Sequence, residues 1–368
     1  MKHPITALLI LSVHAWGCGS PSRPTSADAM NSDDIWSPSH DAVDAGDTRD
    51  SPAESDDTDH LDPDARPTKD AIVPDPKPTC ANGWTPPNVV ANLASHGLPE
   101  LSGMVASHAH SDLLWMHNDS GGEALIHPVI VGEPPLLPIA LPGVDAVDFE
   151  DIARSRCPHT ELECLWVADI GNNLLDRDEL VLIRLLEPSL DPERSAGIAP
   201  EDIASIRFRY PDEPVNAEAL FVDPDGTTFW ILEKTSDVTV RLFRGDASLV
   251  SEVQTLVKIG TLQSPGMDVQ DGLGRMITGA DMHPAGERVV IRTYTGSFEY
   301  VLPQPSAVDA LVDAEPHLIA WGPLAESQGE AIAYAPTGDQ VFTASENLLA
   351  PDPSFQPLHA YSCQPELD

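Results

Sequence analysis

Two short apolar runs separated by a tight turn recur along the chain after about residue 85. In the clearest copy, at 217–233, the apolar run 219–222 meets the turn Asp223-Pro-Asp-Gly226, and a second apolar run follows. Proline presets the second turn position and glycine accepts a positive φ, so this pattern predicts a β-hairpin. Two further copies, at 277–293 and 329–345, keep the Pro-x-Gly turn. Two more, at 101–118 and 149–169, lack the proline.

Further strand-like runs follow each hairpin. They lie at 124–131 and 136–141, 180–186 and 203–210, 239–244 and 253–262, 298–302 and 317–321, and, after the last hairpin, at 358–363 alone. The run 88–93 can supply the missing strand from the other end of the domain. Five units of four strands with shared ends are typical of a propeller. We therefore predict an all-β fold, a single five-bladed β-propeller with four-stranded blades over residues 79–368. Six blades, a solenoid and two stacked sandwiches are the alternatives.

The first residues have the composition of an export signal. Lys2 is positive, the run 5–13 is apolar, and Cys18 follows Ala15-Trp16-Gly17, in which the small residues Ala15 and Gly17 flank a tryptophan. The apolar run is roughly half the ~20 residues that span a bilayer. This resembles a bacterial lipoprotein signal peptide at residues 1–17, with Cys18 acylated after cleavage, and ordinary secretion is the alternative. By resemblance to Gram-negative lipoproteins, Gly19 directly after this cysteine favours sorting to the outer membrane. We therefore expect a lipid anchor at the outer membrane or cell surface.

Residues 18–78 are rich in Asp, Ser, Pro and Thr. Between residues 19 and 77 the chain has 15 acidic and 5 basic residues. Such a segment buries too little apolar surface to fold, so we predict a disordered acidic tether. A calcium-binding or partner-binding tail is the alternative.

The remaining domain is acidic as well. The whole chain has a formal net charge of −39, and residues 78–368 contain 44 acidic against 14 basic residues. This field repels nucleic acid and anionic lipid head groups and attracts cations. We expect a monomer whose partner is a small molecule, a glycan or an envelope protein, and no nucleic acid.

Four cysteines remain after Cys18. Cys157 and Cys164 flank the turn of one hairpin, while Cys80 and Cys363 lie at the two ends of the folded region. In an oxidising compartment we predict disulfides Cys80–Cys363 and Cys157–Cys164; four free thiols are the alternative.

Polar residues occupy equivalent positions in the five hairpins. The first strand begins and the second ends at the same end of the propeller, because the two are antiparallel neighbours. The first position holds Ser102, Glu150, Glu218, Thr278 and Glu330; the second holds Asn118, Asp169, Glu233, Thr293 and Ser345, followed by Asp119, Ile170, Lys234, Tyr294 and Glu346. We therefore predict that carboxylates converge on one mouth of the central channel, where they raise one another's pKa.

A bound hard cation explains this acidic set, and calcium, which takes oxygen ligands, is the predicted cofactor. Strand-end carboxylates in a water-filled channel and a catalytic pair are the alternatives. The predicted metal ligands are Asp119, Glu150, Asp169, Glu218, Glu233 and Glu330. The predicted ligand-binding residues are Asn118, Lys234, Arg292, Tyr294 and Glu346.

Several motifs around this mouth also resemble a known family. They are Glu100-Leu-Ser-Gly103, Asn118-Asp-Ser-Gly121, Asp148-Phe-Glu-Asp-Ile-Ala153, Asp169-Ile-Gly-Asn172 and Glu218-Ala-Leu220. As a set they are similar to the extracytoplasmic propellers grouped as SdiA-regulated and phytase-like ("esterase-like activity of phytase") proteins. The resemblance implies a secreted or lipid-anchored propeller, often with calcium.

Two functional classes stay open. One is a calcium-holding binding lipoprotein; the other is a calcium-dependent hydrolase of phosphate esters or related small molecules. The chain lacks GxSxG, HExxH, P-loop and GxGxxG motifs, so nucleophile-elbow hydrolases, zincins and nucleotide-binding folds have no local support. The shortage of Lys and Arg opposes a polyphosphate substrate.

Overall fold

The computed structural model describes residues 80, 83–119, 121–190, 198–250, 252–266, 272–322, 326, 328–347 and 350–364. The predicted signal peptide, Cys18 and the acidic tether lie outside these residues. All described residues belong to the second of the two units into which the chain divides, Asp70–Asp368. Within them, no helix combines the length and apolarity that crossing a bilayer requires.

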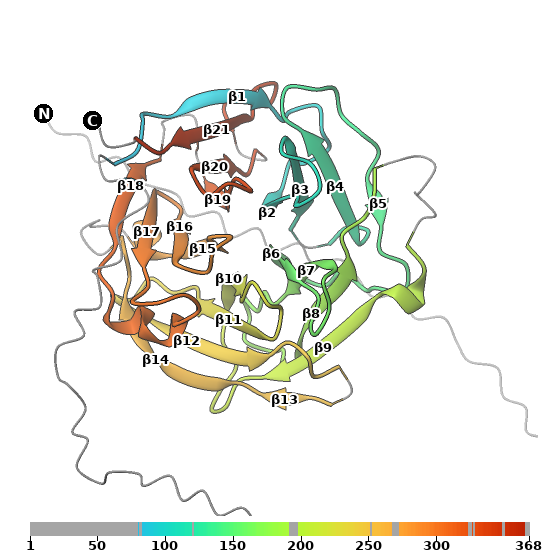
Figure 1. The fold of residues 1–368 in the computed structure, drawn as a ribbon, viewed down its shortest axis with the longest axis vertical. Coiled ribbons are helices and arrows are strands. Elements are labelled where there is room, and N and C mark those ends of the chain that lie inside the picture. The colour runs from blue at the N-terminus through green and yellow to red at the C-terminus, as the bar shows by residue number, and fades with distance from the viewer. Residues whose placement is uncertain are drawn as a thin grey trace, which may run out of the picture. The chain divides into compact units, whose positions relative to one another are not determined.

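The strands of this second unit form five sheets arranged in a ring (Figure 1). Blade 1 contains β2 (Leu101–Ala106), β3 (Leu113–Asn118), β4 (Leu125–Ile130) and β5 (Ile139–Ala140). Blade 2 contains β6 (Phe149–Arg156), β7 (Glu163–Asp169), β8 (Leu180–Leu186) and β9 (Ala204–Arg209). Blade 3 contains β10 (Ala217–Val222), β11 (Thr228–Glu233), β12 (Thr239–Asp246) and β14 (Val257–Gln263).

Blade 4 contains β15 (Ile277–Met282), β16 (Arg288–Thr293), β17 (Gly296–Val301) and β18 (His317–Trp321). Blade 5 contains β19 (Gly329–Tyr334), β20 (Gln340–Ser345), β21 (Pro357–Ser362) and β1 (Asn88–Asn92). Short 3₁₀ helices cover Pro200–Asp202 (η1), Gly272–Arg275 (η2) and Val308–Asp313 (η3). The predicted five-bladed propeller is confirmed, and so are the five hairpins.

The Pro-x-Gly turns form as their sequence requires. Gly226, Gly286 and Gly338 close the hairpins of blades 3, 4 and 5 with φ of +74°, +69° and +74°. Glycine adopts this left-handed region without the steric cost that a Cβ brings. The turn chemistry therefore explains why these three hairpins were the easiest to identify.

One strand was not anticipated. The predicted run 253–262 divides into β13 (Gln254–Thr255) and β14, and these belong to different sheets. β13 leaves its own blade and pairs in parallel with β9 of blade 2, with Gln254 opposite Phe208. It therefore covers the outer edge of blade 2, which limits edge-to-edge pairing there.

The ring closes as predicted, with β1 completing blade 5. β1 pairs antiparallel with β21, placing Asn88 opposite Ala360 and Asn92 opposite Pro357. The predicted disulfide Cys80–Cys363 joins the two ends at this seam, with a Cα–Cα distance of 4.9 Å. The second predicted disulfide, Cys157–Cys164, closes the turn between β6 and β7 with a Cα–Cα distance of 5.0 Å.

The apolar core lies between the blades. The inner strands β2, β6, β10, β15 and β19 are neighbours around the axis, and each apolar cluster combines side chains of two adjacent blades. Trp115, Trp166 and Trp230, on the second strands of blades 1, 2 and 3, are buried in these clusters. No blade has a core of its own, so the blades stabilise one another.

A buried carboxyl group at the axis joins three blades. Asp151, on β6, accepts backbone N–H bonds from Ile152 at 2.9 Å, from Leu220 of β10 at 2.8 Å and from Ala280 of β15 at 3.1 Å. Asp281, on β15, similarly accepts the N–H of Tyr334 on β19 at 2.8 Å. These bonds satisfy backbone donors that face the axis and cross between inner strands.

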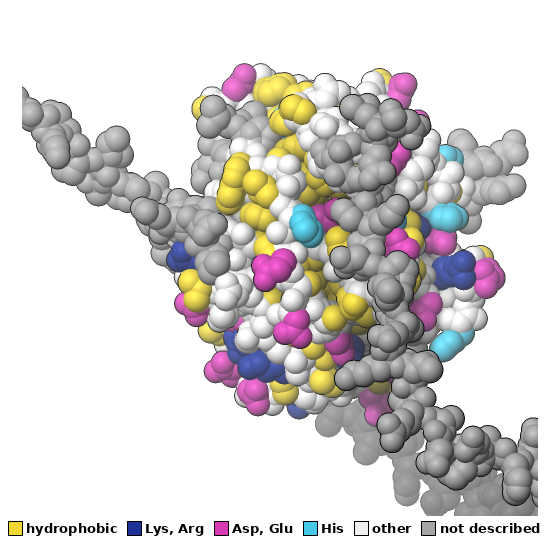
Figure 2. Space-filling model, turned by 60° about the vertical axis from the view of Figure 1, so that its left-hand side comes forward, with side chains coloured by type: hydrophobic (Ala, Val, Ile, Leu, Met, Phe, Trp, Pro, Cys, Tyr) yellow, Lys and Arg dark blue, Asp and Glu magenta, His cyan; other side chains and the backbone are white. Residues whose placement is uncertain are grey.

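The surface agrees with the composition. Figure 2 shows one side of the protein, on which acidic side chains outnumber Lys and Arg and stand among apolar ones. The acidic groups on this side are dispersed.

Candidate functional site

A β-bulge recurs at the same place in all five blades. The pairing of each inner strand with its neighbour shifts by one residue near the start of the inner strand. A bulge leaves one residue outside the ladder and re-aims its side chain. The residues skipped by the register are Ser102, Glu150, Glu218, Thr278 and Glu330, all of them buried. The five first-position residues of the sequence repeat are therefore the five bulge residues.

Two of these bulge residues hold neighbouring blades together. The Ser102 hydroxyl donates to the carbonyl oxygen of Glu150 at 2.6 Å, and the Thr278 hydroxyl donates to the carbonyl oxygen of Gly329 at 2.8 Å. Their oxygens are engaged with backbone, so the charge at this mouth comes from the three glutamates and from residues on the adjoining loops.

Lys234 supplies a positive charge among these carboxylates. Its Nζ pairs with Oε1 of Glu218 and lies 4.9 Å from the ring centroid of Tyr294. Burial alone would lower the pKa of Lys234, but the carboxylates of Glu218 and Glu330 raise it well above the usual value. Lys234 is therefore a fixed cation.

Three carboxylates beside Lys234 form the tightest acidic group. Asp119, Asp148 and Glu150 each place an oxygen so that all three atoms lie within 4.8 Å of one another. Gly171 lies directly against two of them: a Cβ there would come within 2.2 Å of Oδ2 of Asp148 and of Oε1 of Glu150. A residue without a side chain at this position thus leaves room for the carboxylates.

The burial of these acids raises their pKa values. Burial raises the pKa of Glu150 well above its usual range, and the charges of Glu218 and Asp119 add to the effect. Burial also raises the pKa of Asp148, although Arg177 opposes it. Oε2 of Glu218 is buried and has no hydrogen-bond partner among the described residues. The cluster therefore has more oxygen acceptors than Lys234 can satisfy, and burial penalises its negative charge unless a further cation compensates.

The opposite side of the mouth is polar as well. Oε1 of Glu330 accepts a bond from Gln328 Nε2 at 3.1 Å, and the same nitrogen donates to Oε2 of Glu346. Burial raises the pKa of Glu330 well above its usual range, Lys234 opposes this, and Glu218 adds to it. The mouth is thus continuous from the Asp119 side to Glu346.

Several predicted site residues have partners outside this cluster. Asp169 pairs with Arg177 at 2.7 Å and accepts the N–H groups of Val147 and Asp148 at 3.1 Å each. It therefore positions the loop that bears Asp148. Glu233 binds Arg241 through both oxygens, at 2.6 and 2.8 Å.

Arg292 and Asn118 also serve the fold. Arg292 is completely buried, with Nη2 paired to Glu326 and Nη1 donating to Ser297 at 3.2 Å. Arg292 and His359 outweigh burial and lower the pKa of Glu326 to about 2. Asn118 bonds backbone atoms of Glu100 and Gly97 at 3.2 and 2.9 Å. The sequence repeat located these residues but gave no indication of their partners.

The mouth also contains residues outside the predicted set. Asp148 lies two positions before the bulge residue Glu150, and Gln328 lies two positions before Glu330. Aligning the residues that stand two positions before the bulge in each blade would have identified Asp148 and Gln328 from the sequence. Gly171 could not be identified from the sequence as a site residue, because it has no side chain and contributes only space for the carboxylates of Asp148 and Glu150.

Comparison with known proteins establishes no family. No family model matches the chain, and no curated protein sequence is similar to it. Among solved structures, it is similar to a chain of "Crystal Structure of Mitotic Checkpoint Complex", with 10% identity, 71% of this chain and 63% of that chain covered, and a TM-score of 0.33. It is also similar to a chain of "Kuenenia stuttgartiensis Hydrazine Synthase", with 13% identity, 68% and 94% covered, and a TM-score of 0.37. The chain spans less than two thirds of the first of these.

Proposed function

We propose that this propeller binds a divalent cation, best matched by calcium, at its acidic channel mouth, and that the loaded mouth binds a small molecule, a glycan or an envelope protein. The observation that carries the proposal is the convergence of Asp119, Asp148 and Glu150, with three oxygens within 4.8 Å of one another. Carboxylates this close repel one another unless a cation lies between them.

The ligand set suits calcium better than magnesium. Ca²⁺ binds oxygen at about 2.3 to 2.6 Å, so one ion can contact oxygens up to about 5 Å apart. Mg²⁺ binds at about 2.0 to 2.1 Å, demands near-ideal octahedral geometry and usually keeps several waters, so a cluster of protein carboxylates suits it less. Oε2 of Glu218 is buried without a hydrogen-bond partner among the described residues, and the charge of Glu218 acts on Glu150, so this oxygen is a further acceptor on the same mouth.

Calcium binding can be tested by thermal unfolding and calorimetry of the folded domain, first freed of metal with EDTA. Ligand at a hundredfold excess over Kd stabilises a protein by about 2.7 kcal/mol. We expect calcium to raise Tm, magnesium to raise it less, and Glu150→Gln to abolish the calcium effect. Glu233→Gln is the matched control, because it removes the same charge from a residue paired with Arg241. An unchanged Tm, or an equal rise in the Glu150 variant, would refute the proposal.

The hydrolase alternative is decided with the same protein. Phosphomonoester, phosphodiester and lactone substrates are assayed in calcium and in EDTA. Turnover that requires calcium and disappears in Glu150→Gln would make the mouth a catalytic site. Calcium binding without turnover would leave it a binding site.

The proposed cellular setting is a lipid anchor on Cys18, which holds the propeller at the outer membrane or cell surface. The resemblance of residues 1–17 to a lipoprotein signal supports it. Labelling cells with an alkyne fatty acid should mark the wild-type protein, and Cys18→Ser should remove the label and release the protein from membranes. Unlabelled wild-type protein would leave ordinary secretion as the explanation.

A further inference from the structure

The end of the channel opposite the acidic mouth contains a separate cavity of about 460 Å³, formed where the inner strands of all five blades end. Its size lies in the range of small-molecule sites, about 300 to 1,000 Å³. None of the carboxylates grouped around Lys234 lines it. Asp281 belongs to its lining and bonds across to β19. This cavity is therefore independent of the proposed cation site.

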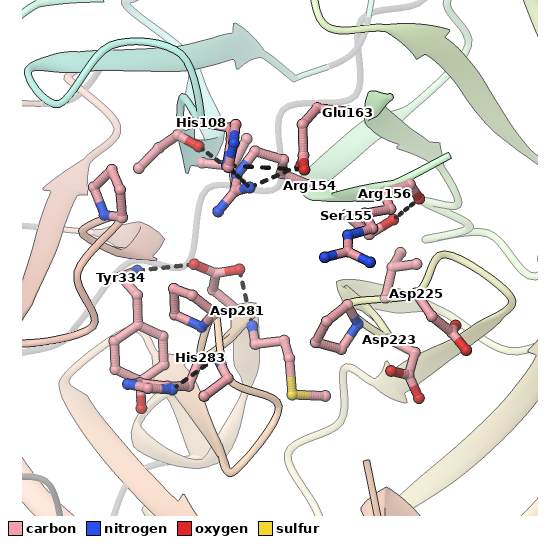
Figure 3. A pocket seen from close by; sticks show the side chains of 18 of the residues that line it. His108, Arg154, Ser155, Arg156, Glu163, Asp223, Asp225, Asp281, His283 and Tyr334 are labelled. Atoms are coloured by element: carbon pink, nitrogen blue, oxygen red, sulfur yellow. Dashed lines mark hydrogen bonds and ion pairs between the residues drawn. The ribbon is translucent and has the colours of Figure 1, made fainter. Parts of the chain in front are cut away.

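One wall of the cavity is basic. Arg154 and Arg156 are two positions apart at the end of β6 and both line the cavity (Figure 3). Arg154 is fixed by three contacts: Nε donates to Ala106 O at 3.0 Å, Nη1 pairs with Glu163 at 2.9 Å, and Nη1 lies 3.4 Å from Nδ1 of His108. A guanidinium held in this way is pre-organised to bind a carboxylate or phosphate.

Arg156 is the more available of the two. Its side chain is 55% exposed, and its ion-pair partner is Glu161, which is 88% exposed and 3.5 Å away. Exposed pairs of this kind contribute little and exchange readily. Arg156 can therefore exchange Glu161 for an anionic ligand with little loss of folding stability.

The neighbouring wall is acidic. Asp223 and Asp225 lie on the turn after β10, and the backbones of the two walls are joined by the bond from Arg156 N to Pro224 O at 3.1 Å. Asp223 accepts a bond from the Ser306 hydroxyl at 2.8 Å, and Asp225 accepts two bonds from Thr227 at 2.8 Å. Among the described residues no ion pair joins the acidic wall to either arginine, so opposite charges stand on adjacent walls of one cavity.

We propose that this cavity binds a small zwitterion, with a carboxylate or other anionic group against Arg154 and Arg156 and a protonated amine against Asp223 and Asp225. A ligand with a single charge is attracted to one wall of the cavity and repelled by the other, which carries a charge of the same sign. A neutral ligand forms an ion pair with neither wall. Amino acids and short peptides with free ends carry this pair of charges.

The probes are three forms of L-alanyl-L-alanine: the free dipeptide, its N-acetyl derivative and its C-terminal amide. Binding to the folded domain is measured by calorimetry at neutral pH in EDTA, which keeps the cation site out of the measurement. Hydrogen bonds to charged groups contribute about 1.5 kcal/mol or more, which corresponds to roughly a tenfold change in affinity. We expect the free dipeptide to bind tightest and each capped form to bind at least about tenfold more weakly.

Two variants connect the binding to the two walls. Arg156→Gln should weaken the free dipeptide and the N-acetyl form and leave the amide unchanged. Its control is Arg207→Gln, since Arg207 is also an exposed arginine paired with an exposed glutamate, Glu179, at 3.2 Å. Asp225→Asn should weaken the free dipeptide and the amide. Its control is Asp246→Asn, because Asp246 accepts the same two bonds from the residue two positions ahead.

Three results would overturn the proposal. They are absence of binding by all three probes at millimolar concentration, equal affinity for the free and capped forms, and variants that behave as their controls do. Circular dichroism and Tm of each variant establish that the propeller is intact, so a loss of binding is read as a loss of the wall charge.

Discussion

Removing the Cys80–Cys363 disulfide should destabilise the propeller much more than removing Cys157–Cys164. The two bonds close loops of very different length, with sequence separations of 283 and 7. In the chain-entropy model the stabilisation is about 5.6 kcal/mol for the long loop and about 2.4 kcal/mol for the short one. The difference of about 3 kcal/mol depends on loop length alone.

The assay compares two double variants, Cys80→Ser/Cys363→Ser and Cys157→Ser/Cys164→Ser, with the wild-type domain by denaturant and thermal unfolding. A domain of this size loses about 2 to 4 °C of Tm per kcal/mol, so the two variants should differ by roughly 6 to 12 °C. Excess reductant provides the control, because it breaks both bonds and should bring the wild-type protein and the two double variants to similar stability. Equal losses, or a greater loss from the short-loop variant, would refute the reasoning that the long bond acts by restricting the unfolded chain.

Three further predictions concern the channel. Asp151→Ala should cost at least about 3 kcal/mol in unfolding free energy, because it leaves three buried backbone N–H groups without an acceptor; a loss below about 1 kcal/mol would contradict this. Burial raises the pKa of Asp281 to about 7, so the folded chain binds an extra proton and stability should fall as pH rises from about 4 to about 7. Unfolding in EDTA at about pH 5 and about pH 7.5 measures this, Asp281→Asn should flatten the profile, and a rising profile would be inconsistent with it. Gly171→Ala should remove calcium binding while Gly122→Ala, whose Cβ would meet no atom within 4 Å, should retain it; calorimetry distinguishes the two.

The architecture was predictable because its signals are local. A Pro-x-Gly turn between two apolar runs specifies a hairpin with little help from the rest of the chain. Three hairpins with this turn, two that lack its proline and the shared ends together specify a closed ring. β13 was missed because its partner, β9, belongs to another blade. A two-residue strand has no period of its own, so only the tertiary structure reveals it.

The candidate site was predictable in position and not in detail. The repeat located Glu150, Glu218 and Glu330 because a bulge at one register re-aims all three. It could not separate them from Asp169 and Glu233, which are neutralised by Arg177 and Arg241. Those arginines lie on the segments that follow each hairpin, where the repeat pattern no longer aligns the blades.

The apolar clusters between blades are unequal, and this has a consequence for how the ring opens. The cluster between blades 4 and 5 has six buried residues, and the fully buried pair Arg292–Glu326 lies in this region. This is the smallest of the apolar clusters, so it contributes the least apolar burial. The buried ion pair adds little, because desolvation offsets most of its attraction. We expect native-state hydrogen exchange to show local opening first at the amides of β15 and β19. The covalent bond thus reinforces the seam between the chain ends, while the ring's most labile interface is the one formed by consecutive blades.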